Sequence, residues 1–307
     1  MPKVLVATIK PFAAVAVEQI RKIIEEVGYQ FALLEKYESE EQLREAVADA
    51  NALIVRSDKI HAGIMDAAPD LKIVVRAGAG YDNIDLQAAT ERGIVVMNTP
   101  GQNANAVAEL ALGMMVYMAR NQFNGKPGTE LKGKTLGIHA FGHVGKRVAQ
   151  IAKGFGMKLF AFDPFIPDDE ISKEGVTPLK SVEELYEKCQ YVSLHIPANE
   201  KTIKSINFAL MSRMPQNAVL VNTARKEIIN EDDLLKMFAE REDFKYISDI
   251  APDCAAEIAE KYAGRYFFTP KKMGAQTAEA NINAGLAAAR QIVNFFEKGD
   301  RTFQVNK

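Results

Sequence analysis

The stretch TLGIHAFGHVGKRVAQIAKGFGMKLFAFD, residues 135–163, decides the fold of this chain. It opens with a short apolar run at 136–141, which predicts a buried strand. A turn containing Gly142 and Gly145 follows, then apolar residues at helical spacing, and then a second apolar run that ends at Asp163. Strand, glycine turn, helix, strand and terminal acid together make the βαβ layout of a dinucleotide-binding site.

The glycine turn and its acid predict the kind of dinucleotide. Glycines let the backbone approach a pyrophosphate, and the first N–H groups of the next helix face its charge. We therefore expect cofactor contacts from Gly142, His143, Val144 and Gly145. Asp163 lies 18 residues after Gly145, where a carboxylate accepts hydrogen bonds from the adenosine ribose and repels a 2′-phosphate. The expected cofactor is NAD rather than NADP.

One position departs from the pattern G-x-G-x-x-G. The window at 140–145 reads AFGHVG, with Ala140 in the place of the first glycine. Alanine is tolerated there only if its φ is negative, so the glycine pattern alone is moderate evidence. The alternative interpretation is an ordinary strand–turn–helix whose glycines serve packing, and the placement of Asp163 argues against it.

Composition bounds the class of protein. A length of 307 residues predicts about two domains, and 48% apolar with 25% charged residues is typical of a globular protein. A net charge of −2 argues against nucleic acid or an anionic membrane as the main partner. Two cysteines, Cys189 and Cys254, cannot form a disulfide framework and indicate a reducing compartment. The first residues lack a signal-peptide layout, and the apolar segment 104–118 is broken by Glu109, so a cytoplasmic location is expected.

Strand and helix patterns alternate along the whole chain and predict α/β domains with parallel sheets. Strands are expected at 3–9, 52–55, 71–75, 94–97, 136–141, 159–162, 191–196, 218–222, 246–250 and 266–269, and helices at 14–27, 40–50, 105–119, 231–241 and 275–298, besides the helix after Gly142. Pro100 and Gly101 punctuate residues 99–103 and predict a crossing between two domains there.

Two strand ends in the first hundred residues carry groups that bind anions. Arg56 and Ser57 end one strand, and the run Gly78-Ala79-Gly80 follows another. Ligands of open parallel sheets gather at the carboxyl ends of strands, and successive glycine amides form an anion-binding nest. The plainer alternatives are a solvated charge for Arg56 and a tight turn for the glycines.

Several stretches, taken in order, resemble the D-isomer-specific 2-hydroxyacid dehydrogenases, and within that family most of all the short D-3-phosphoglycerate dehydrogenases. They are VRAGAGYDNID (75–85), VVMNTPGQNANAVAELALGMM (95–115), FDP (162–164), LHIP (194–197), NTAR (222–225), SDI (248–250) and GAQTAEA (274–280). The resemblance implies a fold of two Rossmann-like α/β domains. A cofactor domain of residues 99–282 is inserted into a discontinuous substrate domain, residues 1–98 and 283–307, and the family's dimers imply a homodimer.

The resemblance also implies a reaction, the NAD-dependent oxidation of D-3-phosphoglycerate to 3-phosphohydroxypyruvate, the entry to serine synthesis. Two alternatives stay open. One is a dehydrogenase of another D-2-hydroxy acid, such as glycerate or lactate. The other is a catalytically silent NAD-binding sensor. No metal is expected.

Site residues follow from the matched motifs. The family's catalytic arginine falls on Arg225, whose guanidinium can hold a carboxylate and a carbonyl oxygen together. Gly78, Ala79 and Gly80 would supply amides to the substrate carboxylate, and Arg56 and Ser57 would hold the phosphate. Asp249 matches the residue that binds the nicotinamide amide. The remaining assignments are Asn103 to the substrate and His195, Pro197, Thr223, Ala224 and Gly274 to the cofactor, with His143 and His195 either contacting the cofactor or structural.

Two departures from the family concern the acid/base group. The family's histidine is missing, because the chain reads Thr-Pro-Lys-Lys-Met-Gly-Ala at 269–275, and the partner glutamate of that histidine is replaced by Cys254. A histidine base needs a carboxylate to raise its pKa, whereas a lysine, with a pKa of about 10.4, needs lowering. The paired losses therefore favour a lysine as the proton-transfer group.

The register leaves two lysines open for this role. Alignment on the Gly274-Ala275 pair selects Lys272, and alignment on the Thr-Pro pair selects Lys271. We prefer Lys272, because a helix start at Gly274 would be the more rigid anchor. That helix N-terminus, Arg225 and the cofactor ring are all expected to lower the pKa of Lys272. A solvated loop charge is the alternative for either lysine.

Overall fold

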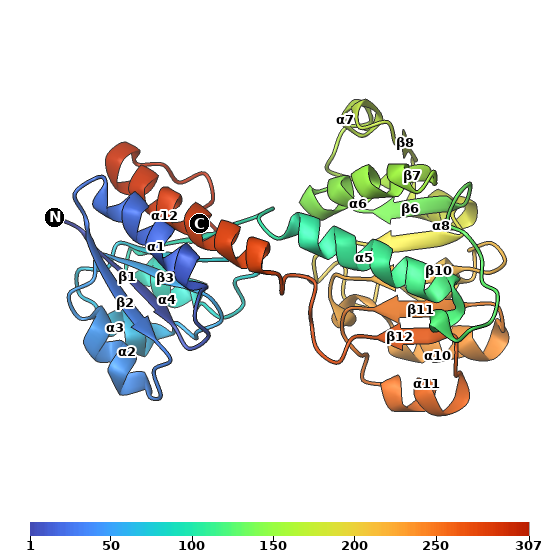
Figure 1. Ribbon diagram of the computed structural model, residues 1–307, viewed down its shortest axis with the longest axis horizontal. Coiled ribbons are helices and arrows are strands. Elements are labelled where there is room, and N and C mark those ends of the chain that lie inside the picture. The colour runs from blue at the N-terminus through green and yellow to red at the C-terminus, as the bar shows by residue number, and fades with distance from the viewer. Residues whose placement is uncertain (307) are drawn as a thin grey trace. The chain divides into compact units, whose positions relative to one another are not determined.

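The computed structural model describes residues 1–306, in two compact units (Figure 1). The first unit contains Met1–Asn103 and the segment from Thr277 onward, and the second is Ala104–Gln276. The sequence predicts boundaries at 98/99 and 282/283 instead. The second boundary falls at 276/277 because the last helix is capped by Thr277, whose side chain accepts the Ala280 N–H, and packs from its start within the first unit.

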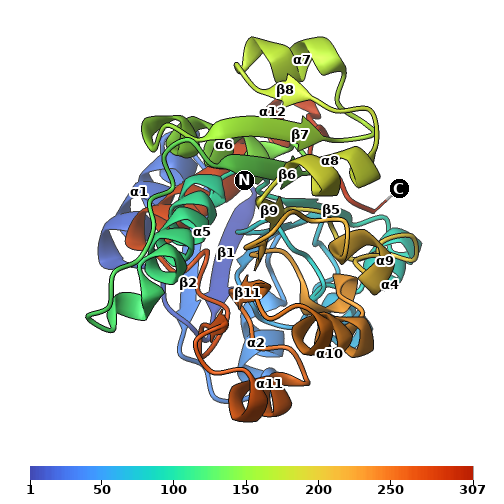
Figure 2. The same ribbon diagram turned by 90° about the vertical axis from the view of Figure 1, so that its right-hand side faces the viewer.

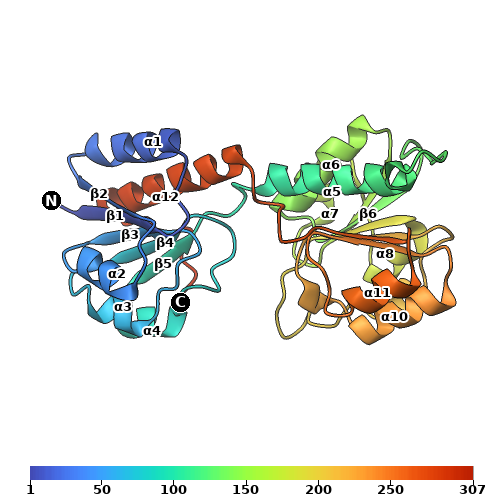
Figure 3. The same cartoon turned by 60° about the horizontal axis from the view of Figure 1, so that its bottom comes forward.

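The first unit is a five-stranded parallel sheet in the order β2-β1-β3-β4-β5. Its strands are β1 (Lys3–Thr8), β2 (Gln30–Glu35), β3 (Ala52–Val55), β4 (Ile73–Arg76) and β5 (Val95–Asn98). Helices α1 (Ala14–Glu25) and α12 (Ala278–Lys298) cover one face, and α2 (Glu40–Val47), α3 (Ala62–Asp66) and α4 (Leu86–Glu91) cover the other (Figure 3). Successive residues of β1, such as Val4 and Leu5, enter opposite cores, so the central strands are apolar throughout.

The second unit is a seven-stranded parallel sheet in the order β12-β11-β10-β9-β6-β7-β8. Its strands are β6 (Thr135–His139), β7 (Lys158–Phe162), β8 (Thr177–Pro178), β9 (Tyr191–Leu194), β10 (Val219–Asn222), β11 (Lys245–Ser248) and β12 (Tyr266–Phe268). Helices α5 (Ala104–Ala119), α6 (His143–Gly154) and α7 (Asp168–Lys173) contribute to one core, and α8 (Val182–Lys188), α9 (Phe208–Met211), α10 (Glu231–Glu240) and α11 (Ala255–Lys261) to the other. Short 3-10 turns lie at Asn121–Phe123 and Lys226–Ile228, and β8 with α7 forms one edge of the unit (Figure 2).

In each sheet the strand order changes direction at one point. A ligand site is expected beside that point. In the second unit β6, β7 and β8 run outward in one direction, while β9 to β12 run in the other, so the reversal lies between β6 and β9. In the first unit the reversal lies between β1 and β3. Ligands of open α/β sheets bind at the carboxyl ends of the strands beside such a reversal.

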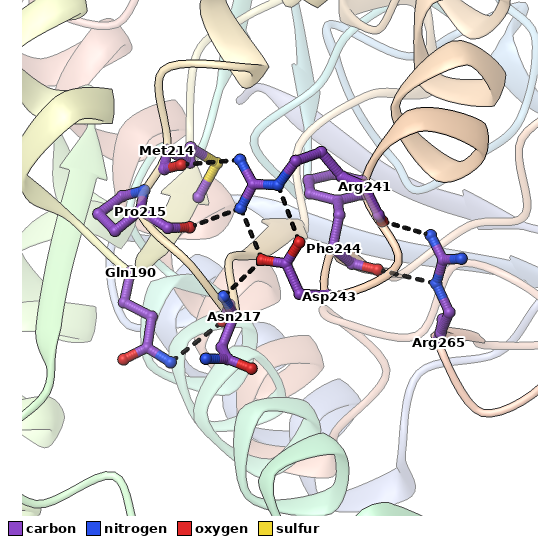
Figure 4. Close-up of polar contacts among 8 residues, drawn as sticks. All are labelled: Gln190, Met214, Pro215, Asn217, Arg241, Asp243, Phe244 and Arg265. Atoms are coloured by element: carbon purple, nitrogen blue, oxygen red, sulfur yellow. Dashed lines mark hydrogen bonds and ion pairs between the residues drawn. The ribbon is translucent and has the colours of Figure 1, made fainter.

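The opposite, amino edge of the second sheet is closed by a polar network (Figure 4). Arg241 binds both carboxylate oxygens of Asp243 at 2.8 and 2.6 Å and also donates to the Met214 and Pro215 carbonyls. Asp243 accepts the Asn217 N–H at 2.6 Å, and Arg241 with this N–H lowers the pKa of Asp243 to about 2. These residues precede β10 and β11, so the network joins strand starts and stabilises the edge away from the reversal point.

Among residues 1–306, no helix is long and apolar enough to cross a membrane. Within the same range, no group of three or more histidine, cysteine, aspartate or glutamate side chains could hold a metal ion.

Candidate active site

The glycine turn between β6 and α6 is shaped by close packing at one glycine and open space at another. A Cβ added to Gly145 would lie 2.4 Å from the Ala140 carbonyl oxygen and 3.0 Å from Ile138 Cγ2, so only glycine lets α6 approach β6 this closely. A Cβ added to Gly142 would meet no atom of the described residues within 4 Å. No side chain of the described chain caps α6, so its first N–H groups, from His143 to Gly145, remain available to an anion.

Ala140 does not meet the condition of a negative φ, although the turn is built as the glycine pattern requires. Ala140 has φ +77°, in the region that glycine normally occupies. The cause is local: the Ala140 N–H donates to the Phe162 carbonyl on β7 at 2.9 Å, and the chain must then turn sharply to begin α6. The chain keeps the glycine conformation at this position without the glycine.

Asp163 follows β7 and is tied to the same turn. One carboxylate oxygen accepts the Phe141 N–H at 2.7 Å, and the other accepts the Phe165 N–H at 2.8 Å. Two main-chain donors therefore fix the orientation of this half-buried carboxylate, and the remaining lone pairs can accept from a ribose diol.

Two histidines lie at the reversal point, His139 at the end of β6 and His195 just after β9. The His195 N–H donates to the His139 carbonyl at 2.9 Å, and the His195 ring contacts the Ser193 hydroxyl at 3.0 Å. Burial lowers the pKa of His139 to about 4 and that of His195 to about 3, so both rings are neutral at pH 7. Neutral rings can orient a cofactor but cannot supply a cation. Pro197, also expected at the cofactor, is exposed two residues further on.

Lys272 reaches the loop after β10. Its Nζ donates to the main-chain carbonyls of Ala224 at 2.5 Å and Thr223 at 3.4 Å. More than a third of the residue is exposed, but its ammonium end is enclosed by the protein. Burial of that end, and secondly the charge of Arg225, lower the pKa of Lys272 to about 8, while Asp249 and Glu227 oppose the shift.

The expectation of a helix start at Gly274 is wrong. Residues 270–276 form a loop with one turn at 274–275, and α12 begins at Ala278. A helix N-terminus therefore does not lower the pKa of Lys272. The rigid anchor is Asp249 instead, whose carboxylate accepts the N–H groups of Met273 and Gly274 at 2.7 and 2.8 Å. Each oxygen of Asp249, expected at the nicotinamide amide, thus already accepts an N–H of the protein.

Asn222 shapes the loop that carries Arg225, a role that motif matching missed. Its side chain accepts the Ala224 N–H at 2.9 Å and donates to the Arg225 carbonyl at 2.9 Å. It is 1% exposed, and a buried asparagine at the end of a strand is the signal that could have found it. The neighbouring Thr223 hydroxyl is buried and has no hydrogen-bond partner among the described residues, which fits a ligand at this loop.

In the first unit, Arg56 is held at the carboxyl end of β3. One guanidinium nitrogen donates to the Lys10 and Pro11 carbonyls at 2.8 Å each, and another donates to the side chain of Asn281 on α12. The guanidinium carbon lies 5.1 Å from the centre of the Phe12 ring. The cation is therefore oriented before any ligand arrives.

Asp58, which the sequence did not single out, organises the same strand end. It is 3% exposed and accepts the N–H groups of Ile9, after β1, at 2.7 Å and of Arg56 at 3.3 Å. Asp58 therefore joins the segments that follow β1 and β3, the two strands that flank the reversal point.

Two further residues were predicted to bind the substrate. Ser57 is exposed beside Arg56, and Asn103 directly precedes α5.

The run Gly78-Ala79-Gly80 after β4 was expected to offer free amide N–H groups to an anion, and at least one of them is not free. The Gly78 N–H donates to the Arg76 carbonyl at 2.8 Å, so this amide is already hydrogen-bonded. The Ala79 carbonyl accepts from the Asn98 side chain at 2.6 Å, which ties the run to β5. Gly78 has φ +157°, at the limit of the left-handed region, and Gly80 ends the run.

The second unit thus has the features of a dinucleotide-binding α/β domain: a winding reversal, an open glycine turn, an uncapped helix and an oriented carboxylate. Residues 92–258, more than half of the chain, match the family described as D-isomer specific 2-hydroxyacid dehydrogenase, NAD binding domain. The chain belongs to this family of NAD-dependent enzymes.

Similar proteins carry two activity names. The chain is 36% identical to a D-3-phosphoglycerate dehydrogenase of Methanocaldococcus jannaschii over 294 residues, 90% of this chain and 55% of that protein. It is also 36% identical to a hydroxypyruvate reductase of Thermotoga maritima over 274 residues, 82% of this chain and 87% of that protein. The crystal structure of an NAD+-bound 3-phosphoglycerate dehydrogenase from Entamoeba histolytica matches with 49% identity and a TM-score of 0.88, covering 100% of this chain and 99% of that one. The chain spans only a little over half the length of the M. jannaschii relative.

Proposed function

We propose that this protein oxidises D-3-phosphoglycerate to 3-phosphohydroxypyruvate with NAD+, the entry to serine synthesis. The observation that carries the proposal is the placement of Lys272 beside the Arg225 loop with a pKa of about 8. A group that must accept and return a proton near neutral pH works best with such a pKa. The names of similar proteins, D-3-phosphoglycerate dehydrogenase among them, agree with this choice of substrate.

In the second unit, different residues transfer the proton, bind the substrate and hold the cofactor. Lys272, in its neutral form, takes the proton of the substrate 2-hydroxyl, and in its charged form returns it. Arg225 holds the carboxylate and the developing carbonyl oxygen. Bound NAD+ would supply the acceptor for the hydride that leaves the 2-carbon. Residues 142–145 would hold its pyrophosphate and Asp163 its ribose, with His195, Pro197, Thr223, Ala224 and Gly274 also in contact.

In the first unit, Arg56 supplies the cation for the phosphate, with Ser57 beside it, and the run 78–80 with Asn103 supports the rest of the substrate. In this proposal the first unit, residues 1–103 with the segment from Thr277 onward, is the substrate domain, and the second unit, residues 104–276, is the cofactor domain. The support for Arg56 is that its guanidinium is already oriented by main-chain carbonyls and by Asn281.

The direct test is a spectrophotometric assay of NADH oxidation with 3-phosphohydroxypyruvate. We expect turnover that depends on both compounds. If NADH binds and no 2-oxo acid is reduced, the protein is an NAD-binding sensor and the enzymatic proposal is wrong.

A second candidate substrate is hydroxypyruvate, because the hydroxypyruvate reductase relative is as similar to this chain as the phosphoglycerate dehydrogenase relative. Arg56 separates the two, since only the phosphorylated compound needs a fixed cation. We expect Arg56→Ala to raise KM for 3-phosphohydroxypyruvate by on the order of 10²-fold, the effect of losing a charge-assisted hydrogen bond. Arg21→Ala, on the exposed side of α1 beside Glu25, is the matched control. An unchanged KM in Arg56→Ala would reject the phosphate assignment.

We also propose a cytoplasmic homodimer. Both cysteines are free thiols, which suits a reducing compartment. Phe123 is 65% exposed on the second unit and packs edge-to-face against Tyr117 with ring centroids 5.3 Å apart, so it offers an aromatic contact to a second copy. Light scattering that finds a monomer at micromolar concentration would overturn the dimer, and cell fractionation tests the location.

A further inference from the structure

Asp249 is a buried carboxylate whose hydrogen bonds all point to one loop. It follows β11 and is 1% exposed. One oxygen accepts the Met273 N–H at 2.7 Å, and the other accepts the Gly274 N–H at 2.8 Å. The first oxygen also lies 3.1 Å from the Thr269 hydroxyl, whose single proton is shared with the Lys271 carbonyl at 2.8 Å. A buried carboxylate is costly unless donors surround it, and here the loop 269–274 supplies two N–H groups and the shared Thr269 hydroxyl.

These bonds enclose Lys272 on both sides. Thr269 lies three residues before it and Met273 directly after it, and both contact the same carboxylate oxygen, Thr269 through its hydroxyl and Met273 through its N–H. The Thr269 N–H also donates to the Ser248 carbonyl at 3.1 Å, which fixes the start of the loop on β11. The main chain at Lys272 is therefore held relative to the sheet while its side chain extends toward Ala224.

The loop packs closely against Asp249 at Gly274. A Cβ added there would lie 2.8 Å from the Asp249 Oδ2 atom and 3.2 Å from Val107 Cγ2 on α5. The glycine is required by the close approach of the carboxylate. The same closeness leaves little of the carboxylate accessible to a ligand.

We propose that Asp249 is a positioning residue for Lys272: its carboxylate closes the loop 269–274 and so holds the ammonium group against the loop of Arg225. This inference rests on the proposed role of Lys272 in proton transfer. It gives Asp249 a task other than contact with the nicotinamide amide.

The first test reads the loop itself and needs no activity. Asparagine offers one acceptor oxygen instead of two, so Asp249→Asn must lose the bond to Met273 or to Gly274. We expect amide hydrogen exchange at residues 273 and 274 to accelerate by on the order of tenfold or more, while exchange in β10 and β11 stays unchanged. Asp169→Asn, an exposed carboxylate that pairs with Lys173 on α7, is the matched control. Unchanged exchange at 273 and 274 would overturn the proposal.

The second test separates positioning from cofactor contact. A loosened loop misplaces Lys272, so we expect kcat of Asp249→Asn to fall by on the order of 10²-fold with little change in the Kd for NADH. The pH at which oxidation reaches half its maximum should also fall, because the carboxylate that favours the Lys272 ammonium is gone. A weakened Kd for NADH with kcat unchanged would assign Asp249 to the cofactor instead.

Two further variants keep the test usable if Asp249→Asn does not fold. Thr269→Val removes the hydroxyl beside Asp249, and Gly274→Ala pushes a methyl group against the carboxylate, so each should accelerate amide exchange at residues 273 and 274 on a smaller scale. Loss of the proposed function looks different. If Lys272→Ala kept full turnover, Lys272 would not transfer the proton, whereas the exchange result for Asp249→Asn would still stand.

Discussion

The ammonium group of Lys272 donates a 2.5 Å hydrogen bond to the main-chain carbonyl of Ala224, the residue before Arg225. Two cationic side chains are thereby brought to one loop of the second unit. Like charges at short range disfavour the protonated lysine, and burial of its ammonium end disfavours it further. The Lys272 side chain thus extends to the loop of Arg225, and its surroundings favour release of its proton.

The first prediction compares the two adjacent lysines. Lys272→Ala should lower kcat by on the order of 10² to 10⁴, the usual contribution of a general acid/base group, while NADH still binds. Lys271→Ala should cost far less, because Lys271 is exposed and its carbonyl, not its side chain, joins the loop through the Thr269 hydroxyl. Steady-state kinetics of both variants decide the point. The reverse ranking would transfer the role to Lys271, and near-normal activity in the double variant would end the lysine mechanism.

The second prediction is a pH profile. In oxidation Lys272 must be neutral, so kcat should rise with pH and level off above a midpoint near the pKa of about 8. In reduction the lysine must be protonated, so kcat should fall through the same midpoint. Lys272→Arg stays protonated at all these pH values and should lose the oxidation limb. A wild-type midpoint at the ordinary lysine value of about 10.4 would contradict the lowered pKa.

The third prediction concerns Asp163 and cofactor choice. Its carboxylate is fixed by the Phe141 and Phe165 N–H groups, so it cannot easily turn away from a 2′-phosphate. We expect kcat/KM to favour NADH over NADPH by on the order of 10²-fold or more through like-charge repulsion. Asp163→Ser should remove most of that preference by weakening NADH binding. Glu170→Gln, a surface carboxylate on α7 near Lys146, should leave the preference intact. Equal use of both cofactors by the unmodified protein would contradict this assignment.

The central strands could be predicted from the sequence because parallel strands buried on both faces are continuous apolar runs. Strand β2 could not, since it lies at the sheet edge and none of its residues is fully buried. The short helices α3, α4, α7, α8, α9 and α11 also went unpredicted, because a helix of four to seven residues shows too few turns for a periodic pattern.

Site residues that directly follow a strand could be predicted from the sequence. Contacts between one loop and another could not. Parallel strands bring the residues after β6, β9, β10 and β11 to one edge, so motifs on them converge. The contact of Asp249 with the N–H groups of Met273 and Gly274 depends on how the loop 269–274 folds back, which no spacing reveals. The start of α12 could have been predicted, because threonine is a favourable N-cap residue. The Thr277 side chain accepts the Ala280 N–H.

The last prediction tests the conformation of Ala140. At φ +77° an alanine pays roughly 1–2 kcal/mol relative to an unstrained residue, and glycine does not. Glycine adds about 0.4–1 kcal/mol of unfolded-state entropy in return, so Ala140→Gly should stabilise the second unit by about 0.5–1 kcal/mol. Scanning calorimetry should show a higher melting temperature for that unit, with the Kd for NADH little changed because the backbone of the turn is already in the glycine conformation. Ala149→Gly is the matched control, since the same substitution inside α6, at a residue 1% exposed, should destabilise by about 1 kcal/mol or more. A lower melting temperature for Ala140→Gly would mean that the methyl group contributes more by packing against its neighbours than the positive φ costs.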